Sequence, residues 1–138
     1  MDKLIGLLHE GGYSCVVSKG GECRTFTKPG IMDLYELIEN DPEFLHGASV
    51  ADKVVGKAAA TLMIRGGVAR MYADVISEPA IALLRNSTVE SGFGQSVPFI
   101  ENRDKSGICP LENACMHTGS LEELFILIKG FVSKICHR

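Results

Sequence analysis

The sequence predicts a three-layer α/β/α sandwich built around a mixed sheet. Strand-like and helix-like segments alternate through most of the chain, an order typical of a sheet covered by helices. Near the N-terminus two short apolar segments flank Gly20-Gly21, which predicts an antiparallel hairpin at the start of the sheet. No linker or low-complexity tract interrupts the 138 residues, so we expect one domain over residues 1–138.

The spacing of apolar residues defines the expected elements. A repeat of three or four residues predicts helices at 3–10, 31–40, 49–65, 77–87 and 120–136, with a short one after Cys109. Short apolar runs predict strands at 14–19, 22–27 and 68–76, with one or two more within 88–100. Asp41-Pro42 end the second helix or begin a short further turn, and residues 101–108 form a polar loop.

Five cysteines, an odd number, favour free thiols in a reducing compartment, so we expect a cytoplasmic protein. The turn at Gly20-Gly21 pairs Ser18 with Cys23 and Cys15 with Phe26. Cys15 and Cys23 are therefore not opposite each other, and a disulfide between them is disfavoured.

Composition excludes several classes of protein. A net charge of −3 with interspersed signs gives no basic surface for nucleic acid. Charges break every apolar stretch well before 18 residues, so no spanning helix is expected. The N-terminal segment carries Asp2 and Glu10 and lacks a small-residue cleavage site, which argues against a signal peptide.

The expected helix 49–65 supplies the first candidate site. Ser49 and Asp52 have capping-box spacing, so Asp52 is either a structural cap or a general base in a cleft at the helix start. Lys53 and Lys57 would share one face near the N-terminus, either solvated or clamping an anion against free N–H groups. Gly56 lies between them, although alanine would favour a helix there. This glycine indicates that a backbone segment, a ligand or another helix approaches the chain closely at this position.

Two further helix openings are candidates. Ser77 directly follows a predicted strand and is expected to be the N-cap of the next helix. In the functional interpretation, its hydroxyl also binds a ligand. Cys109 occupies the N-cap position before Pro110, and Glu112, at the third helical position, is either a cap or a further ligand contact. A thiol there is either activated by the helix N-terminus or simply a small buried side chain. Asn102 and Arg103 lie in the preceding loop and supply anion or amide contacts, unless they are merely polar loop residues.

No metal site or cofactor is expected. Cys109 and Cys115 are six positions apart and His117 follows two positions later, which is neither CxxC nor HxxxH spacing. Glycine-rich nucleotide-binding motifs and GxSxG are absent from the sequence as well.

Three segments resemble a known family. ASVADKVVGKAAA (48–60), VISEPAIALL (75–84) and VPFIENRDKSGICPLE (97–112) are similar to the prokaryotic DUF1893, or TM1506-like, family, and the resemblance covers nearly the whole chain. It implies a cytidine-deaminase-like fold. In true deaminases a zinc ligand and a catalytic glutamate open one helix, and PCxxC opens the next.

Those openings correspond to residues 50–52 and 79–80 of this chain, and neither carries the zinc ligands. Ala80 stands where the first cysteine would be, and the second cysteine is missing too. The resemblance therefore implies the fold without zinc-dependent deamination.

Two functional hypotheses follow, and whether the protein is an enzyme stays open. In the first, a small anionic or nucleotide-like ligand binds around Asp52, Lys53, Lys57 and Ser77, with Cys109 nearby. If the protein catalyses a reaction, Cys109 is the nucleophile and Asp52 a base. In the second, the protein is a non-enzymatic regulatory or interaction module that forms a homo-oligomer. A metal site that uses Cys109 with an acid or a histidine is a third hypothesis.

Overall fold

A computed structural model describes residues 1–28, 31–100, 110–115, 118 and 120–136. Its helices are α1 (Asp2–Gly11), α2 (Met32–Asn40), α3 (Pro42–Leu45), α4 (Lys57–Gly66), α5 (Glu78–Arg85), α6 (Pro110–Cys115) and α7 (Leu121–Cys136). Its strands are β1 (Cys15–Lys19), β2 (Glu22–Phe26), β3 (Ser49–Val55), β4 (Arg70–Ser77) and β5 (Glu90–Val97).

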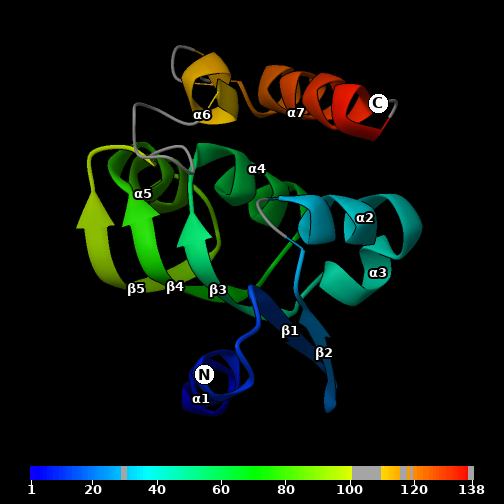
Figure 1. Ribbon diagram of the computed structural model, residues 1–138, viewed down its shortest axis with the longest axis vertical. Helices are drawn as coiled ribbons and strands as arrows, with labels where there is room; N and C mark the ends of the chain where they lie inside the picture. The colour runs from blue at the N-terminus through cyan, green and yellow to red at the C-terminus, as the bar shows by residue number, and fades with distance from the viewer. Residues whose placement is uncertain (29–30, 101–109, 116–117, 119, 137–138) are drawn as a thin grey trace.

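The strands form one mixed sheet in the order β2-β1-β3-β4-β5. β1 is antiparallel to both β2 and β3, whereas β3, β4 and β5 are parallel. Helices lie on both sides of the sheet: α1 packs against β1 and β3 on one face, and α2 to α5 lie on the other (Figure 1). α6 and α7 contact α4 and lie beyond it, farther from the sheet. The predicted mixed α/β architecture is confirmed at this level.

The expected helix over 49–65 is wrong in its first half. Residues 49–55 form β3, which pairs with β1 on one side and β4 on the other, and helix α4 begins only at Lys57. Three valines favour the extended chain here, because β-branched side chains pack well in a sheet. In a strand that is largely buried on both faces, polar and apolar residues do not alternate. The spacing of its apolar residues can then match that of a helix. Gly56 is the boundary between the two elements.

The hairpin has the register that the turn predicted. Ser18 pairs with Cys23, Cys15 pairs with Phe26, and both cysteines are free thiols. Gly20 and Gly21 both have positive φ, the conformation that a two-residue hairpin turn requires. The remaining expected helices and strands are observed, and residues 88–100 contain a single strand, β5.

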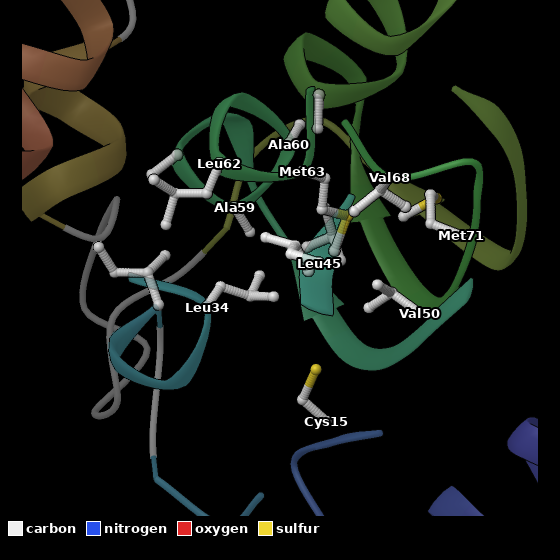
Figure 2. Close-up of a cluster of buried hydrophobic side chains, with 14 of the residues drawn as sticks. Cys15, Leu34, Leu45, Val50, Ala59, Ala60, Leu62, Met63, Val68 and Met71 are labelled. Carbon is white, nitrogen blue, oxygen red and sulfur yellow. The ribbon is translucent and has the colours of Figure 1, made fainter. Parts of the chain in front are cut away.

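The main core lies between the sheet and the helices α2 to α5. Figure 2 shows Leu34, Leu62 and Met63 of the helices facing Val50 and Met71 of the central strands. The Cys15 thiol points from β1 toward this cluster, and it is buried. In the described part of the chain, no helix is both long and apolar enough to cross a membrane.

Candidate functional site: the carboxyl edge of the parallel strands

Two helices begin side by side at the carboxyl edge of the parallel strands. Val55 of β3 pairs with Ile76 of β4, and the residue that follows each of them in the chain, Gly56 or Ser77, is the N-cap of a helix. The N-termini of α4 and α5 are therefore neighbours at one edge of the sheet. In α/β proteins this edge is the usual place for a ligand.

The N-terminus of α4 already holds a carboxylate, that of Glu112. The N–H of Lys57 donates to its Oε1 at 2.6 Å, and the N–H of Ala58 donates to its Oε2 at 3.1 Å. Glu112 is only 9% exposed. A helix N-terminus favours a negative charge, so this contact joins α6 to α4 through a charge-assisted cap. Glu112 is the third residue of α6, as predicted, but its carboxylate caps a different helix.

Gly56 makes room for this carboxylate. A Cβ on residue 56 would lie 2.2 Å from Oε1 of Glu112. The backbone of Gly56 is extended, with φ −101° and ψ −173°, so the close approach and not the conformation requires glycine. The close contact expected at Gly56 is thus made by a side chain of the protein itself.

The two candidate lysines do not share a helix face. Lys53 is an exposed residue of β3, whereas Lys57 is the first residue of α4, so their expected i, i+4 relation is wrong. The Nζ of Lys57 donates to the carbonyl oxygen of Thr118 at 2.6 Å. Lys57 therefore joins α4 to the segment before α7 by its side chain and to α6 by its backbone.

Ser77 is the N-cap of α5, as predicted. Its Oγ accepts a hydrogen bond from the N–H of Ala80 at 3.3 Å, and the residue is fully buried. Pro79 in the first turn has no N–H to satisfy. The hydroxyl is thus used locally, and a role in ligand binding stays a prediction.

Asp52 lies away from both helix openings. It is a strand residue, level with Cys15 of β1 and Ala73 of β4, so the expected capping box with Ser49 is wrong. Ser77 is four residues beyond Ala73 along β4, which corresponds to about 13 Å at 3.3 Å per residue. The structure therefore brings Lys57 and Glu112 together, places Ser77 beside them, and separates Asp52.

Asp52 is 6% exposed, and its pKa is raised to about 7, chiefly by this burial. The carboxylates of Asp33 and Asp74 contribute to the increase. The backbone N–H groups of Val54 and Lys53 lower it, although the Val54 N–H reaches Oδ1 only at 3.4 Å. A carboxyl group that titrates near neutral pH has the property of a general base.

Two titratable neighbours of Asp52, Cys15 and Asp33, were not predicted as site residues from the sequence. Burial raises the pKa of the Cys15 thiol, and the carboxylates of Asp52 and Asp33 raise it further. Asp33, in the first turn of α2, accepts the N–H of Lys28 at 3.0 Å, and burial raises its pKa as well. The hairpin register placed Cys15 opposite Phe26 only, and its pairing with Asp52 depends on β3, which the sequence predicted as a helix.

Three predicted site residues, Asn102, Arg103 and Cys109, lie outside the described residues. Among the residues that are described, no three His, Cys, Asp or Glu side chains are grouped so that they could hold a metal ion.

Comparison with known proteins places the chain in a family. The sequence model of the family described as a domain of unknown function, DUF1893 (TM1506), matches residues 3–132. The chain belongs to the DUF1893 family. No curated protein matches it.

A solved structure from the same family has the same fold. The crystal structure of a DUF1893 family protein, TM1506, from Thermotoga maritima is 26% identical to this chain. The match covers 96% of this chain and 88% of that one, with a TM-score of 0.85. The family resemblance inferred from the three sequence segments is thus confirmed for this DUF1893 protein.

Proposed function

We propose that this protein binds a small anionic or nucleotide-like ligand at the carboxyl edge of β3 and β4, where α4 and α5 begin. The observation that carries the proposal is the Glu112 carboxylate. The α4 N-terminus binds an oxyanion through two amides, beside a lysine and in a space that Gly56 leaves open. Phosphate and carboxylate groups of ligands use the same donors at helix N-termini.

Glu112 also competes with such a ligand. An external anion reaches the N–H groups of Lys57 and Ala58 only when the Glu112 carboxylate moves away. The alternative position is beside Ser77, at the adjacent opening. Removal of the Glu112 carboxylate should therefore strengthen binding at the first position and leave binding at the second unchanged.

A thermal-shift screen with nucleotides and phosphorylated metabolites tests this proposal. We expect at least one class of compound to raise the Tm of the wild type or of Glu112→Gln, and Lys57→Met to reduce the shift. The matched control is Lys3→Met, because Lys3 is exposed on α1, on the other face of the sheet. The absence of any shift in both the wild type and Glu112→Gln would refute the proposal.

We also propose that the fold is deaminase-like but that the protein lacks zinc-dependent deamination. The strand order 2-1-3-4-5 and the paired openings of α4 and α5 support the first part. The opening earlier assigned to residues 50–52 lies instead at Gly56-Lys57, because residues 49–55 are a strand. Lys57-Ala58 and Pro79-Ala80 at the two openings offer no zinc ligand. Ammonia release from cytidine or deoxycytidine by purified, zinc-supplemented protein would contradict this.

A catalytic role would use the Cys109 thiol near the α4 opening. The proposal keeps Cys109 as nucleophile and Lys57 as anion clamp, with Asn102 and Arg103 as further contacts. Asp52 as base and Lys53 as clamp do not fit this opening, because both lie on β3 away from it. For any activity found, Cys109→Ala should abolish turnover while the protein stays folded. Full activity in that variant would reject the thiol.

A second proposed function is a homo-oligomeric interaction module in which the polar helix ends are only caps. One observation favours it: α7 exposes large apolar side chains on its outer face. Such a protein would show no shift in the ligand screen but would self-associate. The cytoplasmic location inferred from the cysteines stays a prediction under either proposal.

A further inference from the structure

Helix α7 has one face in the core and one face in solvent. Leu124, Ile128 and Val132 are buried against the rest of the molecule, and α7 packs on α4 in the layer farthest from the sheet (Figure 1). The α7 outer face is defined here by residues at helical spacing: Glu123, Ile126, Leu127, Gly130 and Lys134.

The middle of the α7 outer face is apolar. Ile126 is 65% exposed, and Leu127 beside it is exposed as well. Thr118 and Glu123 line a shallow hollow together with these two side chains. Large apolar side chains that adjoin a hollow are typical of a protein–protein contact.

Gly130 lies one turn after Ile126 and has no intramolecular explanation. A Cβ at this position would meet nothing within 4 Å. Alanine would favour the helix by about 1 kcal/mol, and this helix does not need a break there. A glycine with open space in front of it leaves room for a second surface to approach the helix closely.

The charges at the two ends of the α7 outer face are complementary. Glu123 lies near the start of the 16-residue helix and Lys134 lies near its end. No salt bridge involving either side chain is found within the described residues. An antiparallel copy of the same helix would place Lys134 of the second copy next to Glu123, and the reverse at the other end.

We propose that the α7 outer face pairs with the same face of a second copy of this chain, antiparallel across a two-fold axis. Ile126 of each copy lies over Gly130 of the other, and Glu123 of each pairs with Lys134 of the other. This arrangement uses the glycine, the exposed isoleucine and both charges at once. It gives the homo-oligomer proposal a surface and rests on that proposal alone, because ligand binding does not enter it.

The expected complex is weak. A 16-residue helix is about 24 Å long, so one helix pair buries less than a standard interface. Dimerisation should therefore depend on concentration and weaken with salt.

Sedimentation velocity of the full chain, with reductant, from about 5 to 500 μM tests the proposal. We expect a monomer–dimer equilibrium, with at least tenfold weaker association in Ile126→Glu. The matched control is Phe93→Ser, which removes an exposed aromatic side chain from the β5 edge, away from α7. A monomer at all concentrations overturns the homo-oligomer proposal itself. If the dimer still forms in Ile126→Glu, or if Phe93→Ser disrupts it and Ile126→Glu does not, the α7 interface is wrong but the homo-oligomer proposal stands.

Two further variants separate an interface from a change in helix stability. Gly130→Ala should raise the Tm of the monomer by improving helix propensity and should weaken the dimer by filling the space for Ile126. Glu123→Lys should weaken association, and adding Lys134→Glu should restore it. Association unchanged in Gly130→Ala, or not restored in the double variant, would contradict the antiparallel arrangement.

Discussion

Two buried carboxylates in this DUF1893 protein have opposite surroundings. Glu112 accepts two backbone N–H groups at a helix N-terminus, at 2.6 and 3.1 Å. Asp52 lies in the centre of the sheet, where the Val54 N–H donates to its Oδ1 at 3.4 Å and the carboxylates of Asp33 and Asp74 lie nearby. Both are almost completely removed from solvent.

The difference shows that burial alone does not decide what a carboxylate does for a fold. Good donors and a helix dipole turn Glu112 into a stabilising link between α6 and α4. Burial that is only weakly compensated by donors, together with the neighbouring acids, makes the charged form of Asp52 unfavourable. We therefore expect removal of the first charge to destabilise the protein and removal of the second to stabilise it at neutral or higher pH.

The largest effect should come from Glu112→Ala. It leaves the N–H groups of Lys57 and Ala58 without their acceptor, and each buried donor costs about 1–3 kcal/mol. We expect a loss of about 3 kcal/mol in the free energy of unfolding, measured by urea denaturation at pH 7. Glu112→Gln keeps one acceptor oxygen and should lose roughly half as much. A loss below about 0.5 kcal/mol, the size of an ordinary surface substitution, would remove the contrast with Asp52.

Gly56→Ala should act on the same contact from the other side. The new Cβ would occupy the position of the Glu112 carboxylate, so we expect a loss of about 2 kcal/mol. The double variant Gly56→Ala/Glu112→Ala distinguishes this cause from a backbone effect. If expulsion of the carboxylate is the cause, alanine at 56 adds no more than about 1 kcal/mol, the ordinary cost of alanine at an N-cap, once Glu112 is gone. Additive losses in the denaturation experiments would show that Gly56 matters for another reason.

Asp52→Asn should increase the free energy of unfolding, and the size of the increase should depend on pH. Below about pH 4 the carboxyl group is protonated in both the folded and the unfolded chain, and it costs no stability. As the pH rises toward 7, the unfolded chain ionises first, because the folded pKa is raised to about 7, and stability falls. We expect the variant to be more stable than the wild type at pH 8 by about 2 kcal/mol, and this advantage to vanish toward pH 4.

Urea titrations at several pH values measure this difference. The variant should show a weaker fall in stability between pH 4 and pH 7 than the wild type does. Parallel pH profiles for the two proteins would mean that Asp52 is ionised without cost in the fold, and the comparison with Glu112 would fail.

The elements that the sequence predicted correctly are those set by local chemistry. The Gly20-Gly21 turn determined the register of β1 with β2, and the Ser77 hydroxyl capped the helix directly after it. Each of these depends on residues a few positions apart, so sequence spacing was enough.

The elements that it missed depend on distant segments. Residues 49–55 are a strand because β1 and β4 pair with them on both sides, and no local pattern records those partners. The cap of α4 comes from Glu112, more than fifty residues away, so the sequence indicated only a glycine that needed space. The candidate site was therefore predicted at the correct helices but with the wrong internal contacts.

Ser77→Ala should have the smallest effect on the free energy of unfolding. It compares the uncharged cap of α5 with the charged cap that Glu112 provides for α4. Ser77 and Glu112 cap neighbouring helices at the same edge, but a hydroxyl satisfies one amide where the carboxylate satisfies two. We expect a loss of about 1 kcal/mol that is the same at pH 5 and pH 8, because a serine hydroxyl does not titrate. Ser91→Ala on the exposed edge strand β5 is the control and should change nothing. A loss that equals that of Glu112→Ala, or that varies with pH, would mean that charge is not what distinguishes the two caps.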